Sequence, residues 1–422
     1  MAVRADVWHA VGMNTLAEHY ARLLGLGDDW QVTDVQLDLP SQSVSIRLQQ
    51  APGAPCRCPD CGEVRPLKDH APQREWRHLD TMQFETILEA RIPRTNCAQC
   101  GVLNVDLPWA DPHGRFTLMF EAFAIQVLQA AGSIEQGRRL LRLSWHAAQD
   151  IMTAAVQRGL ESRNLEEITH VGIDEKSFRR GQSYVSVMTD IDGHRVLEVT
   201  PERTGEAADK LWNTLSEEQK EQIEAVAMDM WPAFISSAEE HVPEAAIVHD
   251  KFHISKHLGE AVDKVRRAEH KALKREGNDR LTGTRYLWLT KAKNLSEERA
   301  ATFEELKKAK LKTSRAWAIR DLFDDFWEQP GEYTGRAFFS DWYAWASRCR
   351  LKPLVKVAKM LKRHLDRIVT WFMHSITNST AEGFNSRIQS LKSAARGFRN
   401  FDNYRTRILF FCGRLQLQPH IP

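Results

Sequence analysis

The stretch Val171-Gly172-Ile173-Asp174-Glu175 decides the fold, because an apolar strand ends here in a carboxylate. Two further apolar runs, 184–189 and 195–199, flank Asp190-Ile191-Asp192-Gly193. This pattern is typical of two strands joined by a tight turn. Asp174 therefore lies on the first strand of a predicted three-stranded meander.

Two more carboxylates are candidates for a metal site together with Asp174. The run Ala225-Val226-Ala227-Met228 ends in Asp229 and precedes a predicted helix, and Glu382 lies far downstream in a helical pattern rich in Lys and Arg. Carboxylate oxygens are the hard ligands through which divalent ions promote phosphoryl transfer on nucleic acid. We therefore expect Asp174, Asp229 and Glu382 to be catalytic and to hold Mg²⁺ or Mn²⁺.

Residues 166–250 follow the order of a ribonuclease-H-like mixed sheet. Three strands come first, and then a helix at 205–215, the strand into Asp229, a helix at 231–240 and a strand at 245–250. In such a sheet the first and fourth strands lie side by side. We therefore expect Asp174 and Asp229 to be neighbours although 55 residues separate them.

Composition indicates an ordinary soluble protein. The chain has 422 residues, of which 42% are hydrophobic and 27% charged, which predicts two to four domains. Net charge is only +2, but 350–407 holds thirteen Lys or Arg against three acidic residues. No signal-peptide core and no apolar run of roughly eighteen residues occurs, so we expect a cytoplasmic location and no membrane partner.

Five of the seven cysteines crowd into 56–100, directly after a predicted hairpin formed by the alternating runs 35–39 and 44–48. Two Cys-x2-Cys knuckles, each followed by glycine, comprise Cys58, Cys61, Cys97 and Cys100. Thiolates at this spacing share one tetrahedral Zn²⁺. Buried thiols or a redox pair are the alternative. Whether Cys56 replaces Cys58 as a zinc ligand stays open.

Residues 116–159 have helical spacing. Ser133 opens a capping-box pattern and Ser144 caps a further helix at 145–158, which together match a helix-turn-helix. The last helix would then enter a major groove, with Trp145, His146 and Gln149 as candidate DNA contacts. An ordinary three-helix bundle is the alternative, but the preceding knuckles favour DNA binding.

The segment 257–374 is charged, helical and rich in tryptophan, with Trp288, Trp317, Trp327, Trp342, Trp345 and Trp371. A bundle whose indoles pack its interior is favoured over a platform that stacks bases. After it, Glu382, Asn385 and Gln389 share one helix face. Basic residues interleaved with aromatics follow, and the candidate contacts to a phosphate backbone are Arg387, Lys392, Arg396 and Arg399.

Taken together, these motifs resemble the ISL-three family of bacterial insertion-sequence transposases. The matching segments are the paired knuckles, the helix-turn-helix, Gly172-Ile173-Asp174-Glu175, Ala227-Met228-Asp229-Met230-Trp231, His249-Asp250-Lys251-Phe252-His253, Ala381-Glu382-Gly383-Phe384-Asn385 and Ala395-Arg396-Gly397-Phe398-Arg399-Asn400. They occur in the family's order, from about Leu23 to Phe411. The resemblance implies a DDE-type transposase whose acidic triad maps onto Asp174, Asp229 and Glu382.

The fold class expected is multidomain α+β, in which a zinc ribbon and a helix-turn-helix precede an α/β ribonuclease-H-like mixed sheet with a helical insertion. The expected parts are a hairpin and zinc ribbon at 1–110, a helix-turn-helix at 111–165, a catalytic domain at 166–256 and 375–415, and an insertion at 257–374. Rival carboxylates are Glu175, Asp190, Asp192 and Asp250. Asp250 could form a metal cluster with His249 and His253, but His253 and His257 on a helix more often make hydrogen bonds. The turn location of Asp190 and Asp192 favours a structural role.

The function expected is that of an insertion-sequence transposase, which binds terminal inverted repeats and target DNA and catalyses metal-dependent strand cleavage and transfer. The resemblance also implies a homo-oligomer when assembled on DNA. Two alternatives remain. A zinc-dependent DNA-binding regulator leaves the carboxylates unexplained, whereas a ribonuclease-H-like nuclease without strand joining would use the same metal site.

Overall fold

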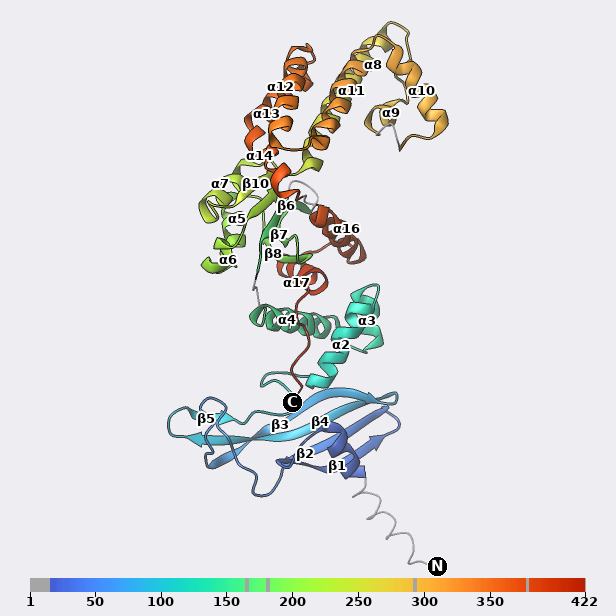
Figure 1. The fold of residues 1–422 in the computed structure, drawn as a ribbon. Helices are drawn as coiled ribbons and strands as arrows, with labels where there is room; N and C mark the ends of the chain where they lie inside the picture. The colour runs from blue at the N-terminus through green and yellow to red at the C-terminus, as the bar shows by residue number, and fades with distance from the viewer. Residues whose placement is uncertain (1–15, 164–166, 180–182, 291–293, 377–378, 422) are drawn as a thin grey trace, which may run out of the picture. The chain divides into compact units, whose positions relative to one another are not determined.

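The computed structural model describes residues 16–163, 167–179, 183–290, 294–376 and 379–421, without the side chains of 379–382. The chain forms two compact units (Figure 1), and each is described by itself. One comprises Met1–Arg163 with Leu415–Pro422, and the other comprises Asn164–Arg414. Within the described ranges, every helix is too short or too polar to cross a membrane.

The first unit contains a five-stranded sheet. Its strands are β1 (Trp30–Asp38), β2 (Ser43–Gln50), β3 (Leu67–Thr81), β4 (Phe84–Cys97) and β5 (Gly101–Asn104). The order is β1-β2-β4-β3, with β5 paired to β4. The antiparallel β1–β2 pair confirms the predicted hairpin, and Trp30, Trp76 and Trp109 pack edge to face in the core beneath it.

Residues 16–24 are helical, and after the sheet come α2 (Leu118–Ala130), α3 (Ile134–Leu140) and α4 (Trp145–Glu161). The side chain of Ser133 accepts the backbone N–H of Gln136, and that of Ser144 accepts the N–H of Ala147. Both predicted helix starts are therefore confirmed, because each serine satisfies an otherwise unpaired N–H of the first turn. The C-terminal residues also belong here, since Arg158 donates to the carbonyl of Leu417.

The second unit is organised around another five-stranded sheet. It comprises β6 (His170–Arg179), β7 (Ser183–Asp190), β8 (Arg195–Pro201), β9 (Ala225–Met228) and β10 (Ala246–His249), in the order β10-β9-β6-β7-β8. The first three strands in sequence are antiparallel, whereas β9 and β10 run parallel to β6. The predicted adjacency of the first and fourth strands is confirmed.

Helices cover both faces of this sheet. On one side lie α5 (Gly205–Trp212), α6 (Glu217–Glu221) and α7 (Pro232–His241), and on the other lie α16 (Ser379–Ala394) and α17 (Phe401–Cys412) (Figure 1). Val171 and Ile173 pack with Trp212 of α5 and Phe234 of α7 in one buried core. The alternate residues of β6 therefore face the side that carries α16.

Between β10 and α16 the chain forms a helical segment. Its elements are α8 (Lys251–Arg275), α9 (Arg285–Leu289), α10 (Glu297–Lys308), α11 (Lys312–Leu322), the 3₁₀ helix η2 (Phe323–Glu328), α12 (Glu332–Arg348), α13 (Lys352–Arg363), α14 (Leu365–Val369) and α15 (Trp371–His374). Trp288, Trp317, Trp327 and Trp342 are buried in its core, which confirms the bundle interpretation for these indoles. Trp345 is 40% exposed.

Candidate functional site

Strand register brings Asp174 and Asp229 together. Ile173 of β6 pairs with Met228 of β9, and an aspartate directly follows each of them in the chain. Adjacent strands lie about 4.8 Å apart, and alternate side chains share a face. Because Ile173 and Met228 point into the α5–α7 core, both aspartates leave the sheet on the face that carries α16.

His253 lies between the two aspartates. It stands in the first turn of α8, which begins directly after β10 and is capped by Asp250. Its Nδ1 is 3.3 Å from Oδ2 of Asp229 and its Nε2 is 4.0 Å from Oδ1 of Asp174. Burial opposes protonation of the ring, but the hydrogen bond to Asp229 and the charges of Asp229, Asp174 and Asp250 outweigh it and raise the pKa of His253.

The pKa of Asp229 shifts in the opposite direction. Burial raises its pKa, but the hydrogen bond and charge of His253 and the N–H of Met230 leave the pKa of Asp229 below its ordinary value. The carboxylate is thereby kept ionised, which is the state that ligates a metal.

Asp174 has polar partners of its own. Asn385 of α16 donates its Nδ2 hydrogen to Oδ2 of Asp174 at 2.9 Å, and Nζ of Lys176 lies 3.4 Å from the same oxygen. Glu382 precedes Asn385 by three positions on α16, and residues three apart share a helix face. The side chain of Glu382 lies outside the described residues.

The rival carboxylates divide into structural groups and one neighbour of the site. Asp190 accepts the N–H of Gly193 and the Nε hydrogen of Arg195, and thus closes the β7–β8 turn. Asp192 accepts the Thr169 hydroxyl hydrogen, and Asp250 accepts the N–H of Phe252 at the start of α8. These contacts give all three a structural role.

Glu175 is the neighbour of the site. Burial, followed by the charges of Asp174 and Asp229, raises the pKa of Glu175. Nη1 of Arg203 lies 3.7 Å from Oε1 of Glu175. Glu175 follows Asp174 along β6, and successive strand residues point to opposite faces. It therefore adds negative charge near the aspartates without sharing their face.

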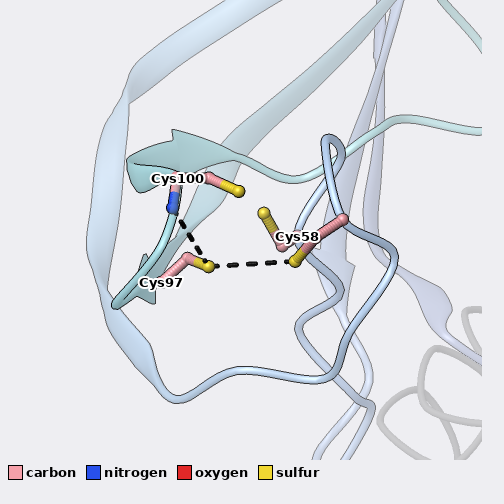
Figure 2. A group of neighbouring side chains, drawn as sticks. Cys58, Cys97 and Cys100 are labelled. Carbon is pink, nitrogen blue, oxygen red and sulfur yellow. Dashed lines mark hydrogen bonds between the residues drawn. The ribbon is translucent and has the colours of Figure 1, made fainter.

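The cysteines form a separate cluster in the first unit. The ligand atoms of Cys58, Cys61, Cys97 and Cys100 all lie within 4.8 Å of one another. Figure 2 shows Cys58, Cys97 and Cys100 turned toward a common point. The sulfurs of Cys61 and Cys97 are 3.8 Å apart, the separation that zinc–sulfur bonds of about 2.3 Å give in a tetrahedron. The geometry therefore fits one zinc ion.

Backbone turns orient these sulfurs. Gly62 and Gly101 follow the two knuckles with φ of 74° and 86°, a conformation that glycine adopts without strain. The backbone N–H of Cys100 points at the sulfur of Cys97, and such N–H donors lower the pKa of Cys97 to about 6. Cys56 instead donates its thiol hydrogen to Gln50 and is not part of the cluster.

The candidate DNA contacts lie on both units. Trp145 and His146 are exposed in the first turn of α4, and Gln149 is half-buried and donates to Thr153 one turn later. In the second unit Arg387, Arg396 and Arg399 are exposed, while Lys392 is half-buried and donates to the carbonyl of Ser177.

Sequence reasoning expected His253 to make hydrogen bonds but did not identify Asp229 as its partner. It did not foresee the contacts of Lys176 and Asn385 with Asp174. One signal was available for His253. It follows the strand 246–249 by four residues, and a helix that begins at the carboxyl end of a parallel strand lies beside the neighbouring strand ends. Lys176 lies two residues after Asp174, on the same face of β6.

Comparison with known proteins relates three segments of the chain to one family. A family model described as transposase matches residues 171–408. The zinc finger of transposases IS204, IS1001, IS1096 and IS1165 matches 54–100, and the helix-turn-helix domain of transposase family ISL3 matches 105–156. The three matches follow the order that the sequence motifs predicted.

Two relatives extend over most of the chain. The transposase for insertion sequence element IS1001 of Bordetella parapertussis is 27% identical over 365 residues, which span 86% of this chain and 89% of the relative. The transposase for IS1557 of Mycobacterium tuberculosis is 28% identical over 411 residues, which span 90% and 92%. Since the transposase model also covers more than half of the residues, the chain belongs to transposase family ISL3 and is a DNA-binding, DDE-type enzyme.

Proposed function

We propose that Asp174, Asp229 and Glu382 hold Mg²⁺ and that the enzyme cleaves and joins DNA at the ends of its own insertion sequence. The adjacency of the two aspartates on one face of β6 and β9 carries this proposal. Their oxygens are the hard ligands that Mg²⁺ prefers. These residues would hold the divalent ion, which when bound would supply the Lewis acidity that activates an attacking water or 3′-hydroxyl and stabilises the leaving oxygen.

Other residues of the chain prepare these ligands. His253 holds Asp229 ionised and oriented through its hydrogen bond, and Asn385 fixes one oxygen of Asp174 from α16. Asn385 lies one turn from Glu382, so the same contact sets where this part of α16 lies against β6. Such outer contacts orient metal ligands and tune their affinity.

The first unit supplies recognition. We assign Zn²⁺ to the four-cysteine cluster, and terminal inverted repeats to the α3–α4 pair, whose second helix exposes Trp145 and His146 in its first turn. Residues there reach base edges when a recognition helix enters the major groove. The relatives are transposases for insertion sequence elements, which supports element ends as the DNA bound. On two such ends we propose a homo-oligomer.

The test of catalysis uses a labelled DNA fragment that carries the parent element's terminal repeats, incubated with Mg²⁺ or EDTA. The wild-type protein should nick the element boundary and then form joined products with Mg²⁺ alone. Asp229→Asn and Glu382→Gln should bind the fragment and leave it intact. Nicks without joined products would identify a nuclease instead. Cleavage by Asp229→Asn would refute the assignment of this ligand.

The test of recognition uses the full-length chain. His146→Ala and Trp145→Ala should weaken protection of the terminal repeats in footprinting, whereas Gln157→Ala, three turns farther along α4, should not. Each lost base contact should weaken binding by about 1–3 kcal/mol. Unchanged protection by both variants would place recognition elsewhere in the protein.

A further inference from the structure

Two histidines and a glutamate gather in the second unit, away from the catalytic aspartates. His170, Glu224 and His374 each offer one ligand atom, and these atoms lie within 4.8 Å of one another. The two imidazole rings meet edge to face with centroids 6.1 Å apart. Neither the resemblance to transposases nor the DNA chemistry accounts for this group.

The backbone fixes where two of the three residues stand. His170 begins β6, and its Cα pairs in register with Ala225, the residue after Glu224. The N–H of Glu224 donates to the carbonyl of Thr169 at 2.9 Å, and its carbonyl accepts the N–H of Ala246 at 2.8 Å. Glu224 is therefore held between the starts of β6 and β10 although its side chain is exposed.

The third residue comes from the end of the helical segment. His374 is the last residue of α15, and Ser375 after it adopts a left-handed conformation with φ of 50°. Just before α15, the hydroxyl of Thr370 lies 2.8 Å from the carbonyl oxygen of Ile247 in β10 and 2.7 Å from that of Arg367, so its one hydrogen is shared between them. This contact holds α15 against the sheet, and the turn at Ser375 ends the helix with His374 beside His170.

A carboxylate orients one of the rings. Nδ1 of His170 lies 2.7 Å from Oδ2 of Asp192, which also accepts the Thr169 hydroxyl hydrogen at 2.7 Å. The bond to Nδ1 leaves Nε2 as the ring nitrogen that can bind a cation. A carboxylate behind a histidine is the usual outer partner of a metal-bound imidazole.

We propose that His170, Glu224 and His374 form a second transition-metal site, with Zn²⁺ as the preferred ion and Asp192 as the outer partner of His170. Two imidazoles and a carboxylate suit zinc, which binds such ligands at roughly 2.0–2.2 Å. A set of two nitrogens and one oxygen is unlike the oxygen ligands that Mg²⁺ prefers. The ion ties the starts of β6 and β9 to the end of the helical segment.

This site is distinct from the catalytic carboxylates. His170 precedes Asp174 by four residues on β6, which is about 13 Å along a strand, and Glu224 precedes Asp229 by five. The two sites therefore lie at opposite ends of the stretch over which β6 and β9 pair. His374 stands eight positions before Glu382, so an ion here fastens the chain shortly before α16.

The experiment counts zinc bound to the full-length chain by mass spectrometry, after equilibration with a small excess of Zn²⁺ and gel filtration. Two equivalents are expected for the wild-type protein, one in the cysteine cluster and one here. His374→Gln and Glu224→Gln should each bind one. Glu224→Gln alters an exposed side chain, so it tests the site even if His374→Gln fails to fold. A second equivalent retained in Glu224→Gln would overturn the proposal.

Two controls separate this site from its neighbours. His194→Asn removes an exposed imidazole near Asp192, and Asp229→Asn removes a catalytic carboxylate, so both should keep two equivalents. Loss of the second ion in Asp229→Asn would assign it to the catalytic site and refute the proposal. Asp192→Asn should keep the ion with a Kd raised about 10–100-fold, as expected for an outer partner. An unchanged Kd would contradict that role.

Discussion

The four-cysteine cluster and the carboxylate site are both candidate metal sites, but they are built differently. The cluster takes four ligands from two short turns beside one sheet, and its sulfurs lie within 4.8 Å of one another. The carboxylate site takes its aspartates from β6 and β9, and side chains of α8, α16 and β6 contact them. The cluster is a closed set of four soft ligands, whereas the aspartates are hard ligands held by neutral and cationic partners.

This difference in ligands indicates that the two sites have different roles. Four thiolates complete the coordination of zinc and leave no position for a reactant, which is typical of a structural ion. Mg²⁺ bound by a few carboxylates keeps positions for water and phosphate oxygens, which catalysis requires. The cluster should therefore control folding of the first unit, and the aspartates should control chemistry with little effect on folding.

The largest expected effect is on the cluster. Cys58→Ser should abolish tight zinc binding there and unfold the knuckles, since structural zinc contributes about 10–16 kcal/mol in small zinc domains. Zinc content and hydrogen exchange of β4 and β5 amides measure the result. Cys56→Ser is the matched control, because Cys56 is buried beside the cluster but outside it. Equal zinc loss in both variants would break the proposed distinction.

A smaller effect should appear in acid. Burial, followed by the charge of Arg77, lowers the pKa of His78 on β3 to about 4. The unfolded chain, with an ordinary histidine pKa near 6.5, binds the proton first, so stability is lost as pH falls from about 6.5 to 4, by up to about 3 kcal/mol.

Hydrogen exchange of β3 amides across this pH range measures the loss. His78→Asn should remove most of this pH dependence, whereas His113→Asn should leave it unchanged because His113 is exposed. A pH profile that is the same in His78→Asn and the wild-type protein would show that another group controls acid stability of the first unit.

The smallest expected effect concerns the partner of Asp174. Asn385→Ala removes the hydrogen bond to Oδ2 and should lower the cleavage rate or the Mg²⁺ affinity about 10–100-fold, as loss of an outer partner does. Cleavage rates measured across a range of Mg²⁺ concentrations separate the two. Gln389 lies one turn farther along α16, and its side chain bonds only to Ser393 in the described structure. The Gln389→Ala variant should therefore cleave normally. Equal losses of cleavage in Asn385→Ala and Gln389→Ala would mean that α16 as a whole, and not the Asn385 hydrogen bond, sets the rate.

Local patterns explain what could be predicted from sequence. The knuckles, the serine caps of α3 and α4 and the β7–β8 turn depend on residues a few positions apart, so their chemistry is visible in the chain. The adjacency of β6 and β9 followed from the order of elements. Asp174 and Asp229 could be paired for that reason.

Long-range contacts account for what was not predicted. His253 meets Asp229 because α8 begins at the edge where β9 ends, and Asn385 meets Asp174 across 211 residues of sequence. The residue type alone does not predict such a contact, since histidine and asparagine on helices often bond locally or to solvent. The grouping of His170, Glu224 and His374 was also invisible, because no spacing relates them.

The central claim is that Asp229 ligates the catalytic ion beside Asp174. The most direct measurement replaces Asp229 with cysteine and assays cleavage of the terminal-repeat fragment in Mg²⁺ and in Mn²⁺. A thiolate binds Mg²⁺ poorly and Mn²⁺ better, so Asp229→Cys should be inactive in Mg²⁺ and recover part of its activity in Mn²⁺. Full activity of Asp229→Cys in Mg²⁺, or the same metal switch in Glu175→Cys instead, would contradict the account.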